Sequence, residues 1–101
     1  MKSELFAQIL SLVAEVTELS ADQILSKVKT DDLVAARSLF VHYCVSYGVP
    51  SISIARFMGR TGTHSVNRYL SNYDSFIRTS YLFRMMDSRI SYALKTDVSR
   101  N

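Results

Sequence analysis

The sequence predicts an all-α fold: a compact bundle of about six helices that forms a single domain over residues 1–101. Two observations lead to this prediction. Apolar residues recur at spacings of three and four along almost the whole chain, whereas no segment shows the alternating pattern of a strand. Serine, threonine and glycine residues that favour helix ends separate these periodic segments.

Length and composition restrict what such a chain can do. A chain of 101 residues leaves no room for a separate catalytic or nucleotide-binding domain of ordinary size. Hydrophobic residues make up 48% and charged residues 21%, the balance of a folded domain with a real core. One cysteine, Cys44, and two histidines cannot supply a disulfide framework or the usual structural zinc sites. We therefore expect packing alone to hold the fold, with no metal and no cofactor.

The first two helices follow from an apolar stripe and a capping box. The stripe places residues at alternating spacings of four and three: Leu5, Ile9, Leu12, Val16 and Leu19. Ser20 and Gln23 have the capping-box spacing, so a short second helix should begin near Ala21 and end around residues 26–27.

The third helix should lie at the centre of the bundle. Thr30 can cap it, and Asp31 and Asp32 suit the positive end of its dipole. Residues 33–47 are apolar on almost every face, which is typical of a helix surrounded by others. Gly48 and the nearby proline should end it.

A short helix, a glycine turn and a second helix come next. Residues 52–58 form the short helix, and Gly59 ends it. A second helix should run from about 63 to 73, with Val66, Tyr69, Leu70 and Tyr73 inward and His64, Ser65, Asn67, Arg68, Ser71 and Asn72 outward. This pattern is typical of a helix-turn-helix.

The last helix should run from about Tyr81 to Lys95 with Ser80 as its cap. We expect it to pack through Leu82, Phe83, Met86, Ile90, Ala93 and Leu94. The tail, residues 96–101, should be frayed.

The charge is unevenly distributed along the chain. Residues 1–50 carry four lysines and arginines against six acidic residues, whereas residues 51–101 carry eight against three. Nearly all cations of the second half are arginines, whose planar guanidinium suits phosphates and guanine edges. Solvated arginines on ordinary helices are the alternative interpretation.

The outward face of the second motif helix holds the candidate binding residues. Thr63, His64, Asn67 and Arg68 are candidates for base contacts, because asparagine and arginine can make bidentate contacts to adenine and guanine. Thr61 and Ser65 are candidates for phosphate contacts. Solvated side chains and helix capping remain the alternative for each of these positions.

No constellation of residues favours an enzyme. The segment 59–63 has two glycines but lacks the strand and the lysine of a nucleotide loop. Cys44 and His42 are two apart on a helix and point to different faces. Asp31 and Asp32 are adjacent and also diverge. We expect no catalytic residues and no nucleotide ligand.

The order of residues resembles a known family, the C-terminal DNA-binding domain of the bacterial replication initiator DnaA, in the class of the Trp repressor. The resemblance covers residues 5–95 and lies in Val13-Ala14-Glu15, Leu19-Ser20, Ile24-Leu25-Ser26-Lys27, Val34-Ala35-Ala36-Arg37, Ile54-Ala55-Arg56-Phe57-Met58-Gly59, Thr63-His64-Ser65-Val66 and Thr79-Ser80. It implies a stand-alone domain without the family's ATPase that binds double-stranded DNA with the helix 63–73 in the major groove. The implied phosphate contacts are Lys27, Lys29, Arg37, Arg56 and Arg60.

Two departures from the family pattern fall at the implied DNA contacts. The family has three basic residues in the loop before the central helix, whereas residues 28–31 hold one cation and one anion. Thr61 and Gly62 occupy positions where the family has arginine and aspartate. The residues leave transcriptional control, an accessory role in replication and mobile-element maintenance open.

The alternative function is a helical protein-interaction module that has lost DNA affinity. The acidic first half and the apolar stripe of the first helix favour it, with a partner protein or a second copy of the chain as the ligand. The N-terminus lacks the features of a secretory signal, and four serines, His42 and the segment 48–50 interrupt the longest uncharged run, 38–55. We expect a cytoplasmic, nucleoid-associated protein with no membrane segment.

Overall fold

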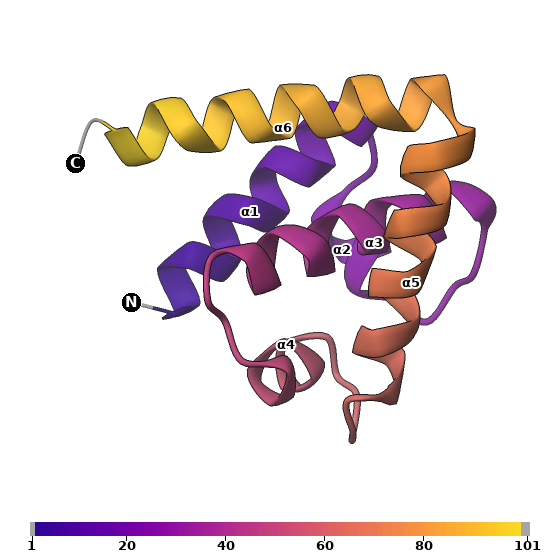
Figure 1. Ribbon diagram of the computed structural model, residues 1–101. Helices are drawn as coiled ribbons and strands as arrows, with labels where there is room; N and C mark the ends of the chain where they lie inside the picture. The colour runs from indigo at the N-terminus through magenta and orange to yellow at the C-terminus, as the bar shows by residue number, and fades with distance from the viewer. Residues whose placement is uncertain (1, 100–101) are drawn as a thin grey trace.

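Six helices make up the fold in the computed structural model, which describes residues 2–99. They are α1 (Lys2–Thr17), α2 (Ala21–Leu25), α3 (Asp31–Ser46), α4 (Ser51–Phe57), α5 (His64–Thr79) and α6 (Tyr81–Ser99) (Figure 1). No strand occurs within these residues, so the predicted all-α class is confirmed.

The central position of α3 follows from its apolar surface. It packs against α1 on one side and α5 on the other, and its residues Leu39, Phe40 and Cys44 are fully buried. The ring of Phe40 lies 6.4 Å from that of Phe6 and 5.9 Å from that of Phe57, and the latter two rings are stacked at 4.3 Å. This aromatic cluster joins α1, α3 and α4.

Side-chain caps fix the starts of α2, α3 and α6 as expected. The Ser20 hydroxyl accepts from the Gln23 backbone N–H, and the Gln23 side chain accepts from the Ser20 backbone N–H, both at 3.0 Å. Thr30 accepts from the Leu33 N–H at 3.2 Å, and Ser80 accepts from the Phe83 N–H at 3.1 Å. Each cap satisfies a backbone donor that the first helical turn leaves free.

Two predicted helix ends were too early. α5 continues past Tyr73 to Thr79, because Phe76 and Ile77 extend the same apolar stripe against the core. α6 continues past Lys95 to Ser99. Residues 100 and 101, the remainder of the predicted frayed tail, lie outside the described residues.

The packing face of α6 also differs from the prediction at one position. Phe83, Ile90 and Leu94 are buried as expected, but Leu82 is 65% exposed. Leu82 lies about 100° around the helix from Phe83, where it lines an open groove between α6 and residues of α1 and α3.

The stripe of α1 faces the chain's own core. Ile9 is fully buried, and the other four members pack against the core: Leu5, Leu12, Val16 and Leu19. This stripe is therefore occupied within the monomer and does not present a free surface to a partner helix.

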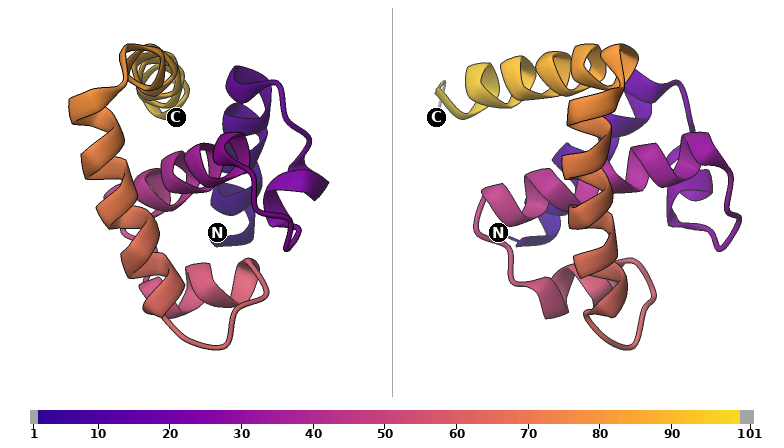
Figure 2. Two further views of the ribbon diagram at one scale, coloured as in Figure 1. Left: turned by 90° about the vertical axis from the view of Figure 1, so that its right-hand side faces the viewer. Right: turned by 45° about the vertical axis from the view of Figure 1, so that its right-hand side comes forward.

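α5 runs along one side of the molecule from α4 at one end to α6 at the other (Figures 1 and 2). Asp87 of α6 links α6 to both α3 and α5 by hydrogen bonds. Its carboxylate accepts from the Tyr43 hydroxyl of α3 at 2.5 Å and from the Tyr73 hydroxyl of α5 at 2.7 Å. Burial and these hydrogen bonds to Asp87 raise the pKa of both tyrosines well above the usual value, so both stay protonated donors.

Gly59 has a backbone conformation that L residues rarely adopt, with φ = +75°. We expect Gly59→Ala to lower the free energy of unfolding by about 1–2 kcal/mol because a Cβ is strained there. Gly62→Ala is the matched control, since Gly62 lies in the same turn, has open space and has no positive φ. Denaturant titration of both variants checks this, and equal stabilities would contradict it.

His42 gives the fold a pH dependence. Its ring stacks on Tyr73 at 3.6 Å, and burial lowers its pKa below 6.5, although Asp87 and Asp74 act in the opposite direction. The folded state therefore favours neutral His42. The contribution of His42 to the free energy of unfolding is complete above about pH 6.5, and it is lost as the pH falls towards the lower pKa of the folded state. We expect His42→Phe, which keeps a stacking ring, to lose less stability than the parent between about pH 7 and pH 5. Denaturant titrations at both pH values test this, and parallel losses would rule His42 out as the cause.

Candidate nucleic-acid interface

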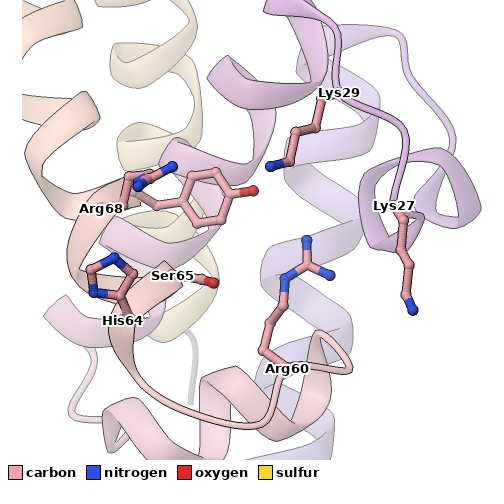
Figure 3. Close-up of a pocket in the computed structure, with 7 residues that line it drawn as sticks. Lys27, Lys29, Arg60, His64, Ser65 and Arg68 are labelled. Carbon is pink, nitrogen blue, oxygen red and sulfur yellow. The ribbon is translucent and has the colours of Figure 1, made fainter.

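Cationic side chains from three segments meet around one cavity. They come from the loop between α2 and α3, the turn between α4 and α5, and the first turns of α5 (Figure 3). The cavity has a volume of about 290 Å³. We call it the basic cavity, and its lining residues are Lys27, Lys29, Arg60, His64, Ser65, Arg68 and Tyr69.

The turn that carries Arg60 is fixed by the end of α4. Gly59 reverses the chain with its positive φ, and the Arg60 N–H donates to the Ala55 carbonyl at 2.7 Å. The chain then reaches Thr63, the N-cap of α5, whose side chain makes no capping hydrogen bond. The first turn of α5, at the positive end of its dipole, therefore borders the basic cavity without a side-chain cap.

Arg37 does not contact this surface, so its predicted phosphate role is wrong. Its side chain is fully buried. Nε donates to the Ile24 carbonyl at 2.7 Å, and Nη2 donates to the carbonyls of Ser26 at 2.8 Å and Gln23 at 3.2 Å. Arg37 instead anchors the end of α2, from which the loop with Lys27 and Lys29 begins.

The sequence around Arg37 indicates that this side chain is buried and binds acceptors inside the protein. Arg37 lies between Ala36 and Ser38 in a helix that is apolar on nearly every face, and both neighbours are buried. A cation in such a helix must find acceptors inside the protein, because an unpaired buried charge is very costly. Helix C-termini such as that of α2 supply free carbonyls for this purpose.

The cations of the basic cavity are unpaired within the part of the chain that the structure describes. None of Lys27, Lys29, Arg60 and Arg68 donates a side-chain hydrogen bond or forms an ion pair there. No acidic side chain lines the cavity. Several like charges with no neutralising partner create a positive potential that attracts anions.

The other predicted site residues lie outside the lining of the basic cavity. Arg56 on α4, Thr61 in the turn and Asn67 on α5 are exposed, and Thr63 is half-buried. Asn67 is one turn from His64 and one residue from Arg68, so it extends the exposed face of α5. Six of the eleven predicted residues thus line one cavity: Lys27, Lys29, Arg60, His64, Ser65 and Arg68.

Tyr69 lines the basic cavity although the sequence pattern places it in the core. Tyr69 can occupy both places, because its ring is buried while the side chain ends in a polar hydroxyl. Periodicity assigns whole residues to a face and therefore cannot detect such a position.

Comparison with models of known protein families gives no match, and comparison with individual curated proteins gives none. The candidate interface therefore rests on its own geometry and charge.

Neither a metal cluster nor a reactive thiol accompanies the basic cavity in the described residues. Within the described residues, no three His, Cys, Asp or Glu side chains gather in a way that could hold a metal ion. Burial raises the pKa of the Cys44 thiol to about 12, so it carries almost no thiolate at neutral pH. None of the described helices has the length and apolar character needed to cross a membrane.

Proposed function

We propose that the chain is a stand-alone helix-turn-helix domain that binds double-stranded DNA, in replication or transcription control at the nucleoid. α4 is the first helix of the motif and α5 is the recognition helix. The observation that carries this proposal is the basic cavity, where unpaired cations from the α2–α3 loop and from the motif converge. The resemblance to the DnaA DNA-binding domain supports the same assignment.

The α2–α3 loop and the turn before α5 are suited to the phosphate backbone. Lys27, Lys29 and Arg60 project from loops at the edge of α5, where they can straddle a strand while the helix occupies the groove. Unpaired lysines and arginines bind phosphates mainly through counterion release, without sequence preference. In this proposal these three residues supply affinity for DNA and orient the domain on the duplex.

The start of α5 is suited to reading bases. His64, Asn67 and Arg68 are exposed on its first two turns, next to the phosphate-binding loops. Val66 and Tyr69 on the opposite side are buried and fix the rotation of the helix about its axis. A helix held in this way presents few, defined side chains to the major groove, and Arg68 is the one suited to guanine.

The preferred sequence is expected to differ from the box of the DnaA family. The turn has Thr61 and Gly62 where the family has arginine and aspartate, and Gly62 offers no side chain at all. Selection of bound duplexes from a random library identifies the preferred site directly. Enrichment of no sequence would count against base reading.

Arg68→Ala tests the division of roles on the selected site. We expect a loss of about 1–3 kcal/mol at one preferred base pair, with a smaller loss on unrelated duplexes. Arg78→Ala is the matched control, because Arg78 is an exposed arginine near the other end of the same helix. A uniform loss on all duplexes would assign Arg68 to phosphate contact.

The protein-interaction module remains the second candidate, and the exposed apolar surface of α6 favours it. The double variant Asn67→Ala with Arg68→Ala separates the two functions. If a helical, folded double variant keeps both the affinity and the sequence preference of the parent, α5 does not read DNA. Protein interaction would then be better supported than DNA binding as the function of the chain.

A further inference from the structure

α6 presents most of the exposed large hydrophobic side chains of the described chain. Four of the seven lie on it: Tyr81, Leu82, Met85 and Tyr92. Tyr81 and Tyr92 are 71% and 75% exposed, and Met85 is 46% exposed. α6 lies at the edge of the molecule, with its outer side uncovered (Figures 1 and 2).

These side chains form a regular stripe. Tyr81, Met85, Ser88 and Tyr92 follow one another at spacings of four, three and four, which brings them onto one face of the helix. We call these four residues the outer stripe. The opposite face of α6, with Phe83, Ile90 and Leu94, is buried in the core, so the outer stripe is left uncovered by the rest of the described chain.

We propose that the outer stripe is the interface of a symmetric dimer, in which a second copy of the chain packs its own α6 antiparallel to the first. The proposal does not depend on DNA binding. It rests on the symmetry of the stripe and on the charges beside it.

The spacing of the outer stripe reads the same in both directions. An antiparallel copy, related by a twofold axis midway between Met85 and Ser88, therefore sets Tyr81 against Tyr92 of the second copy. It also sets Met85 against the small Ser88. A hollow lined by Tyr81, Arg84, Met85, Ser88 and Arg89 lies at this position. A twofold interface requires a patch that is complementary to itself, and this stripe meets that requirement.

The charges beside the outer stripe are complementary in the same arrangement. A groove of about 340 Å³ runs along one side of α6, and its lining includes Leu82, Met85 and Arg89 of α6 as well as Glu18 and Asp32. Glu18 and Asp32 are exposed and form no ion pair within the described residues. The antiparallel copy brings its own Arg89 alongside Leu82 and Met85, on the side of these two carboxylates. Each copy thus adds a second cation beside the acidic groups of the other.

The test is the mass of the folded protein in solution without DNA. We expect the parent, 11.5 kDa as a monomer, to associate to twice that mass in sedimentation experiments at micromolar to submillimolar concentrations, since a single helix pair is a small interface. Met85→Glu brings two carboxylates close together at the twofold axis and should weaken association at least tenfold. Arg89→Glu faces Glu18 and Asp32 and should also weaken it, whereas Arg89→Lys should not.

Ile52→Glu is the matched control, because Ile52 is an exposed aliphatic residue (41%) on α4, at the other end of the molecule. It should leave the dissociation constant unchanged. Circular dichroism establishes that each variant keeps its helices. A parent that stays monomeric throughout this range, or a dimer that Ile52→Glu weakens as much as Met85→Glu does, overturns the proposal.

Discussion

Arg37→Ala is expected to lower the free energy of unfolding by about 3–5 kcal/mol. The substitution removes a large, fully buried side chain and leaves a cavity. It also removes the donors for three carbonyls at the end of α2, those of Gln23, Ile24 and Ser26. Hydrogen bonds to a charged group are worth more than neutral ones, and buried acceptors without donors are costly. Denaturant titration measures the loss.

Two further substitutions separate volume from hydrogen bonding. Arg37→Met restores most of the volume but no donor, so it should be less destabilising than Arg37→Ala and still clearly worse than the parent. Arg37→Lys keeps the charge, but one ammonium group cannot reproduce the fork of the guanidinium that reaches three carbonyls. A loss below about 1 kcal/mol for Arg37→Ala would contradict the anchoring role.

The double variant Lys29→Ala with Arg60→Ala is expected to lower affinity for any duplex about ten- to a hundredfold at low salt. These residues come from different loops and line the basic cavity together. Each lost phosphate contact should reduce the slope of log affinity against log salt by about 0.9. Affinity titrations over a series of salt concentrations therefore yield both quantities, and the slope should fall by about 1.8 in total.

Arg78→Ala with Arg84→Ala is the control, because it removes the same net charge from two exposed arginines, one in the last turn of α5 and one in the first turn of α6. Its effect should be small and should leave the salt slope nearly unchanged. Equal losses in the two double variants would mean that overall charge, and not the basic cavity, determines binding.

The starts of α2, α3 and α6 were predictable because single residues determine them. Ser20, Thr30 and Ser80 each offer a hydroxyl at the point where the first turn leaves a free N–H. Gly48 and Gly59 have the positive φ that ends α3 and α4. Local chemistry of this kind is legible in the sequence.

The burial of Arg37 and the exposure of Leu82 depend on packing between distant segments. Whether Arg37 finds acceptors is decided by α2, 11–14 residues earlier in the chain, and whether Leu82 is covered depends on the angle at which α6 crosses α1. The apolar periodicity of a sequence describes one helix at a time. It predicts neither the acceptors that another segment offers nor the angle between two helices. For the candidate site, residue type indicated which cations could bind anions, but only the fold shows which of them share a cavity.

The loop between α2 and α3 is held at several points before any ligand arrives. Arg37 donates to the Ser26 carbonyl, the Ser26 hydroxyl accepts from the Val28 N–H at 3.3 Å, and Thr30 caps α3. The conformational entropy of this segment is therefore lost during folding rather than during association. A basic arm that folds on its ligand gives a large negative heat-capacity change, because ordering buries new apolar surface. For this loop, calorimetry should show only the smaller change that belongs to the contact surface itself.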